Sequence, residues 1–203
     1  MTDIAERASV WAGVTAPVLS FVGVLLATLV SPSFAWTGNA LSDLGGPTGP
    51  VATDLTRLLF NGGLIAGGLV ALGFGYALFL AARNFVELAG IGLFGLTSLS
   101  MALIGVFPLP QDTHFLVAVS FYVLLSLALW VYGAGNLLAG DRTRGGVTVG
   151  LGVLNTGAWA VWTLTGEFSR PGLALPEVVG AAALAGWTVA TALWVRRRLG
   201  LSS

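Results

Sequence analysis

The sequence contains no cysteine and no lysine, and charged residues of either sign are few. Without cysteine the chain can form no disulfide, no thiolate metal site and no iron–sulfur cluster, and it lacks a cysteine nucleophile. Charged residues make up 9% of the 203 residues, whereas a soluble domain carries about a quarter. Basic and acidic residues number nine each, and this zero net charge argues against a nucleic-acid partner.

Histidine is also scarce, because His114 is the one histidine in the chain. A zinc hydrolase whose metal is held by several histidines is therefore nearly excluded. The carboxylates of Asp43, Asp54, Asp112 and Glu167 could instead supply oxygen ligands to calcium or magnesium. The prediction from the sequence is that the protein holds no metal and no cofactor.

What the chain has in abundance is apolar sequence, since 56% of its residues are hydrophobic. A membrane-spanning helix needs about 20 apolar residues, so the chain has room for about six. Ser33-Phe34-Ala35 resembles a signal-peptidase site, but the apolar run before it is longer than the core of a leader peptide, so this run is predicted to be the first membrane helix. Pro17 within the run predicts a kink in that helix. We predict one all-α domain over residues 1–203, a polytopic membrane bundle of six transmembrane helices at about 8–30, 54–82, 86–107, 114–138, 146–165 and 177–195.

The arginines are distributed unevenly among the predicted loops. Seven lie at the termini and in the second and fourth loops, and only Arg57 and Arg170 lie in the other three loops. Because basic residues favour the cytoplasmic side, both termini are predicted to be cytoplasmic, with the protein in the cell membrane. The stretch Asn39-Ala40-Leu41-Ser42-Asp43-Leu44-Gly45 then lies outside, as do Asp112 and His114.

These outer polar residues predict one polar vestibule that binds a ligand over the helix bundle. Its expected members are Asn39, Ser42, Asp43, Asn61, Asp112, His114, Glu167 and Arg170. If the protein is an enzyme, Asp43 and His114 are the candidate acid–base pair. The alternatives are structural: Asp43 as a turn residue that caps its own backbone, and His114 hydrogen-bonded to Asp112 or to a loop carbonyl. Asp112 is also expected to cap the fourth helix.

Small and amide residues within the spans predict close helix packing. Gly63 and Gly67 form a small-xxx-small pair that lets another helix approach. Asn61 and Asn155 are expected chiefly to hydrogen-bond between helices. Glycine-rich faces also offer a surface for a second copy of the chain or for a membrane partner.

Two short signatures resemble a known family. Trp36 with Asn39-Ala40-Leu41-Ser42-Asp43-Leu44-Gly45, and Gly105-Val106-Phe107-Pro108 with His114 and Ala118, resemble the domain-of-unknown-function 998 family. That resemblance implies a six-helix membrane protein of an archaeal and bacterial family with no established activity. The proline and His-x-x-x-Ala element also resembles, over this one motif, the six-helix Frag1/DRAM/Sfk1 type, which is linked to lipid distribution.

Three functions remain open at this point. The first is a non-enzymatic membrane protein whose vestibule binds a lipid headgroup or a small polar ligand, with membrane lipids as partners. The second is an intramembrane enzyme that acts on lipids through Asp43 and His114, which is less favoured. The third is a structural subunit of a membrane complex.

Overall fold

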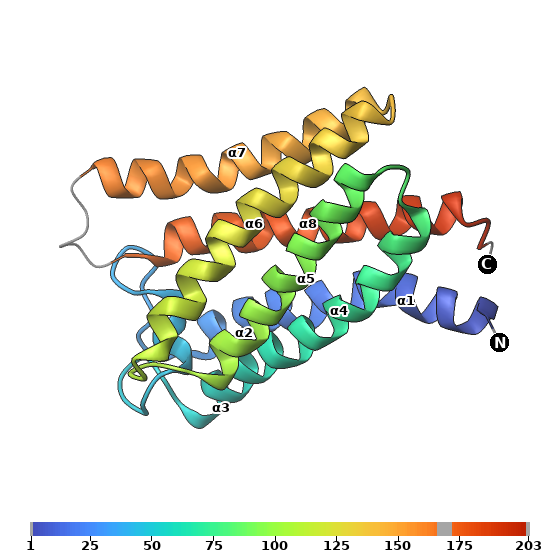
Figure 1. Cartoon of the computed structure of the whole chain (residues 1–203). Coiled ribbons are helices and arrows are strands. Elements are labelled where there is room, and N and C mark those ends of the chain that lie inside the picture. The colour runs from blue at the N-terminus through green and yellow to red at the C-terminus, as the bar shows by residue number, and fades with distance from the viewer. Residues whose placement is uncertain (1, 166–171, 202–203) are drawn as a thin grey trace.

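The structure is a computed structural model that describes residues 2–165 and 172–201, and every regular element in these ranges is a helix (Figure 1). Six helices in the described ranges are long and apolar enough to cross a membrane, which confirms the predicted all-α polytopic bundle. In chain order the elements are α1 (Thr2–Pro17), η1 (Val18–Val22), α2 (Gly23–Val30), η2 (Leu41–Gly45), α3 (Asp54–Arg57), η3 (Leu58–Gly62), α4 (Gly63–Ala81), α5 (Phe85–Val106), α6 (Thr113–Leu138), α7 (Arg142–Leu164) and α8 (Ala174–Arg198).

The first two spans are each interrupted by a π-helical turn. Pro17, which has no N–H to donate, ends α1, and the π-helical η1 follows it. In the second span the π-helical η3 precedes Gly63. A Cβ placed on Gly63 would lie 2.6 Å from the carbonyl oxygen of Leu19, and one on Gly67 would lie 2.6 Å from the Cβ of Ser20. The small-residue pair therefore lets the first span pack closely on the second, as its spacing predicts.

Three helices begin several residues earlier than the sequence predicts, and the first of them, α1, begins at Thr2 and not near residue 8. α7 begins at Arg142 because the Asp141 carboxylate accepts a hydrogen bond from the Arg144 N–H at 3.2 Å and caps the helix. α8 begins at Ala174, whose N–H donates to the carbonyl of Asn39 at 3.0 Å. The predicted boundaries near residues 146 and 177 are therefore wrong by three or four residues, as is common for helix ends.

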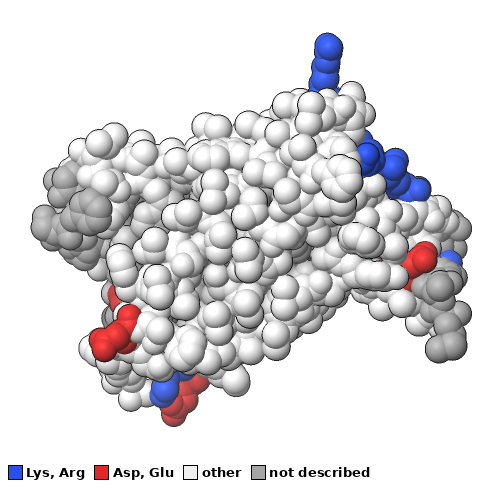
Figure 2. Space-filling model, in the orientation of Figure 1, with Lys and Arg blue, Asp and Glu red and all other residues white. Residues whose placement is uncertain are grey.

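Both termini lie at one end of the bundle, and the loops after α2 and α5 lie at the other (Figure 1). We call the first the arginine end, because it holds Arg83, Arg144 and the Arg196–Arg198 run, and the second the loop end. Figure 2 shows charged side chains at these two ends and an uncharged flank between them on the face in view. This distribution is that of a multi-pass membrane protein.

The core is aromatic at its centre. Phe94 of α5 packs at ring-centroid distances of 6.0 Å from Phe74 of α4 and 5.4 Å from Trp187 of α8. Tyr132 of α6 packs 5.4 Å from the same Trp187. These four rings hold α4, α5, α6 and α8 together, whereas α7 is the least buried of the six spans. A cavity lies between α6, α7 and the start of α8.

Candidate functional site

The polar stretch after the first span folds on its own backbone. Oδ2 of Asp43 accepts hydrogen bonds from the Ala40 N–H and from Nδ2 of Asn39, both at 3.0 Å. Oδ1 of Asn39 in turn accepts from the Ala35 N–H at 3.0 Å. Asp43 therefore has the structural role considered for it above, a turn residue that caps its own backbone. Its carboxylate stabilises the η2 turn.

Two spans anchor the η2 turn at the loop end. The Leu41 N–H donates to Oε2 of Glu177 on α8 at 2.6 Å, and Nδ2 of Asn61 donates to the Gly45 carbonyl at 3.0 Å. The side chains of Leu41 and Leu44 are buried beneath the turn. Asn61 therefore fastens the loop to the second span, whereas the sequence predicts a hydrogen bond to another helix of the bundle.

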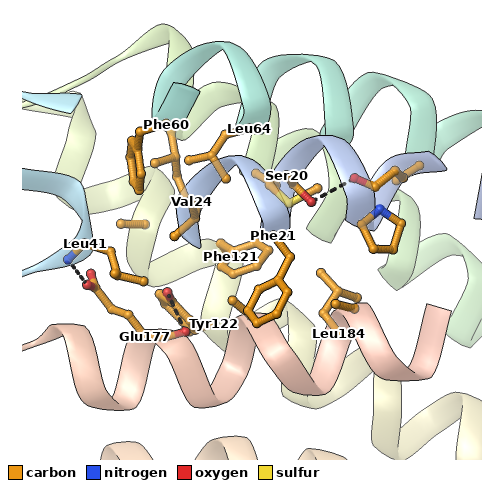
Figure 3. A pocket seen from close by; sticks show the side chains of 18 of the residues that line it. Ser20, Phe21, Val24, Leu41, Phe60, Leu64, Phe121, Tyr122, Glu177 and Leu184 are labelled. Atoms are coloured by element: carbon orange, nitrogen blue, oxygen red, sulfur yellow. Dashed lines mark hydrogen bonds between the residues drawn. The ribbon is translucent and has the colours of Figure 1, made fainter. Parts of the chain in front are cut away.

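Two cavities lie beneath the η2 turn, with volumes of about 60 Å³ and about 580 Å³. The walls of both are mostly apolar. Figure 3 shows the smaller one, with Glu177 directed toward Leu41 and with Phe121 and Leu184 among its apolar walls. Both cavities are lined by the same five residues at their junction, namely Ser42, His114, Ala118, Tyr122 and Glu177.

His114 and Ser42 present hydrogen-bonding groups at this junction. Nδ1 of His114 lies 2.8 Å from the Phe107 carbonyl oxygen, which can only accept, so Nδ1 carries the proton and donates. The structural alternative for His114 was a hydrogen bond to a loop carbonyl, and this bond is the one observed. In the neutral ring this tautomer leaves Nε2 as an acceptor. The Ser42 hydroxyl makes no hydrogen bond with any described residue, and its side chain is buried. Both groups are therefore free to bind a ligand.

Glu177 is a residue of this site that is not among the site residues predicted from the sequence. The sequence places Glu177 at the boundary between the last outer loop and the sixth predicted helix, without assigning it to the site. Its side chain is only 8% exposed and points into the bundle. The signal was present in the periodicity of α8, because Glu177 falls on the same helical face as the buried Gly180, Leu184 and Thr188.

Several predicted site residues do not line either cavity. Asn39 and Asn61 shape the loop from outside, and Asp112 is exposed. The prediction that Asp112 caps α6 is wrong, since it occupies the N-cap position in a helical conformation and its side chain makes no capping hydrogen bond. Glu167 and Arg170 lie outside the described residues.

Asp43 and His114 both line the larger cavity but no hydrogen bond joins them. The hydrogen bonds of the Asp43 carboxylate go to its own loop, and the one of His114 goes to a backbone carbonyl. In the described part of the chain, no three histidine or acidic side chains are grouped so that they could hold a metal ion. The arrangement is a mostly apolar cavity with polar groups at its loop end.

Comparison with known proteins places the chain in a family. A family model described as a protein of unknown function (DUF998) matches residues 14–194, which include both signatures, the four middle spans and most of the first and last spans. No curated protein and no solved structure matches the chain.

Proposed function

The chain belongs to the DUF998 family, whose description names no activity, and we propose that it binds one membrane lipid in the larger cavity. The observation that carries this proposal is that the cavity reaches the flank of the bundle. Its walls include the exposed α6 side chains Phe115, Val119 and Val123, while its end holds Ser42 and His114. A lipid could therefore enter from the hydrocarbon layer without crossing water.

The size and lining of the cavity support an amphiphilic ligand. Its volume of about 580 Å³ falls within the range of roughly 300–1,000 Å³ that is usual for small-molecule sites. Apolar side chains such as Leu127 and Leu173 suit an acyl chain, and the polar groups at the loop end suit a headgroup. The complex would be stabilised chiefly by burial of the chain, at roughly 25 cal/mol per Å² of apolar surface.

The charges around the cavity favour a headgroup with hydroxyl or amine donors. Carboxyl groups of Asp43 and Glu177 line it, and no described lining residue is an arginine. A phosphate headgroup would meet the Asp43 carboxylate without a guanidinium to pair with, which is unfavourable. A neutral glycerol headgroup could instead donate to His114 Nε2 and exchange hydrogen bonds with the Ser42 hydroxyl.

The headgroup chemistry gives a first testable prediction. Monoolein is expected to bind the purified protein at least about tenfold more tightly than oleoyl-lysophosphatidylglycerol, measured by native mass spectrometry with titrated lipid; tenfold corresponds to about 1.4 kcal/mol. The variant Ala118→Phe, which places a ring where the two cavities meet, is expected to lose monoolein binding.

Leu116→Phe is the matched control, because Leu116 lies two positions away on α6, is 64% exposed and lines neither cavity. It should bind monoolein as the wild type does. Equal binding of monoolein by wild type and Ala118→Phe would contradict the proposed location. Tighter binding of the phospholipid would contradict the headgroup assignment.

We further propose that the loop end faces the outside of the cell membrane and that both termini are cytoplasmic. The support is the excess of arginines at the other end, seven against two. Since the chain has no cysteine, single-cysteine variants report one position each. Asp112→Cys is expected to react with a membrane-impermeant maleimide on intact cells and Arg142→Cys only after the cells are opened; the reverse pattern would refute this orientation.

A further inference from the structure

Three guanidinium groups gather around the indole ring of Trp194 at the arginine end. The guanidinium carbons of Arg83, Arg144 and Arg198 lie 5.2, 3.4 and 5.5 Å from the centroid of this ring. They come from three parts of the chain, because Arg83 follows α4, Arg144 lies in the first turn of α7 and Arg198 ends α8. Contact with one aromatic ring therefore holds three positive charges close together.

Two carboxylates belong to this cluster and do not balance its charge. Oε1 of Glu87 accepts hydrogen bonds from Nε and Nη2 of Arg83 at 2.9 and 2.6 Å. Oδ2 of Asp141 lies 3.7 Å from Nη1 of Arg83 and 3.5 Å from Nη1 of Arg144. Arg198 forms no ion pair in the part of the chain that the structure describes. The cluster thus keeps one positive charge in excess, and Arg198 carries it.

The Arg198 side chain offers donors that a ligand can reach. Arg198 is exposed, and its Nε donates to the Ala81 carbonyl at 3.1 Å, which holds the guanidinium in place. The two Nη atoms make no hydrogen bond with any described residue, so their N–H groups are available. Hydrogen bonds from a guanidinium to phosphate oxygens are charge-assisted and among the strong ones.

Apolar side chains that face lipid lie beside the cluster. Val147 is exposed and lies three residues after Arg144 on α7, which puts both on the same side of the helix. Leu193, the neighbour of Trp194 on α8, is exposed as well. Because the cluster lies at the ends of two spans, its charges lie near the level of lipid headgroups and these side chains near the level of acyl chains. A lipid with a negative headgroup complements both parts of this surface, whereas a soluble anion complements only one.

We propose that the arginine cluster of Arg83, Arg144 and Arg198 around Trp194 binds the phosphate group of an anionic membrane lipid. The phosphate accepts from the Nη groups of Arg198, and its negative charge lowers the repulsion among the three guanidiniums. A zwitterionic lipid carries the same phosphate together with a cation, which the cluster repels. The cluster lies at the opposite end of the bundle from the η2 turn, so this site is separate from the proposed lipid cavity and does not rest on it.

The test compares dioleoylphosphatidylglycerol with dioleoylphosphatidylcholine, which differ only in the headgroup, by native mass spectrometry with titrated lipid. The wild-type protein is expected to bind the phosphatidylglycerol about tenfold more tightly, and Arg198→Gln only about twofold, because one basic residue at an anionic surface contributes roughly fivefold. Arg197→Gln is the matched control. It removes the same charge from the neighbouring exposed position, which makes no contact with the Trp194 ring, and should keep the wild-type preference.

Each other outcome contradicts a defined part of the proposal. Equal binding of the two lipids by the wild type would overturn the site, and this comparison needs no variant. An equal loss of preference in Arg198→Gln and Arg197→Gln would replace the site with diffuse attraction to the whole arginine run. Displacement of the phosphatidylglycerol by millimolar inorganic phosphate would overturn the assignment to a lipid.

Two further arms separate this site from the cavity. Ala118→Phe should keep the preference for phosphatidylglycerol, and Arg198→Gln should keep the binding of monoolein. Loss of the preference in Ala118→Phe would place the anionic lipid in the cavity and overturn the arginine site. Since oleoyl-lysophosphatidylglycerol carries the same phosphate, its comparison with monoolein is also made in Arg198→Gln, where the cavity alone decides the result.

Discussion

Replacing Glu87 with alanine is expected to lower the free energy of unfolding by about 3–5 kcal/mol, the usual cost of breaking a buried ion pair from one side. Glu87 is 1% exposed at the arginine end. Its Oε1 accepts from Nε and Nη2 of Arg83 at 2.9 and 2.6 Å and from Nδ2 of Asn136 at 3.1 Å, and its Oε2 accepts from the Arg83 N–H at 2.6 Å. Alanine would remove the acceptor of all four hydrogen bonds, and Nδ2 of Asn136 would keep only its bond to the Tyr132 carbonyl at 2.9 Å.

The measurement is unfolding of the purified protein in mixed detergent micelles, followed by circular dichroism. Asp54→Ala is the control, because Asp54 is 93% exposed and forms only a surface pair with Arg57 at 3.6 Å. Such pairs contribute about 0–1 kcal/mol. Adding Arg83→Ala to Glu87→Ala should cost less than the sum of the two single changes, since the partners share one interaction. A loss below about 1 kcal/mol in Glu87→Ala would show that the network does not stabilise the fold.

Replacing Gly90 with alanine is the second large effect, with an expected loss of about 2–3 kcal/mol. A Cβ on Gly90 would lie 2.7 Å from the backbone N and Cα of Tyr132. Neither atom can move without shifting α6, so the cost is that of overpacking a close helix contact. On α6, Gly135 makes the reciprocal approach, with a virtual Cβ 2.6 Å from the Glu87 backbone N.

Gly92→Ala tests the same helix without the contact. A Cβ on Gly92 meets nothing within 4 Å, so the substitution adds helix propensity alone and should leave stability unchanged or raise it by up to about 1 kcal/mol. Gly90→Ala should therefore lower the stability of the fold, whereas Gly92→Ala should leave it unchanged or raise it. Equal thermal unfolding of both would mean that α5 and α6 do not approach at Gly90.

The sequence predicted features whose physics is local. A long apolar run must be a helix in lipid because each backbone polar group needs a partner within its own segment. For that reason the number and approximate limits of the six spans follow from composition and hydropathy. Gly63 and Gly67 also predicted a close helix approach from their spacing, although the partner, the first span, was identified only in the structure.

Polar residues were harder to interpret, because their neighbours are distant in sequence. Beside the turn between the second and third spans, Glu87 accepts a hydrogen bond from Asn136, and Asn84 donates to the Gly135 carbonyl at 2.8 Å. Glu177, at the start of the last predicted helix, accepts a hydrogen bond from the Leu41 N–H. In each case the partner lies about 50 or more residues away along the chain, and no local pattern identifies it.

The sequence alone determined that this is a six-helix membrane protein with a polar loop after its first span and an excess of arginine at its termini. These properties depend on transfer of each segment from water to lipid, which is nearly additive along the chain. Only the tertiary structure decided that Ser42, His114 and Glu177 meet at one cavity and that Asn155 and Trp159 border it deeper down. Those meetings depend on the way helices pack, which is set by the shapes of side chains far apart in the sequence.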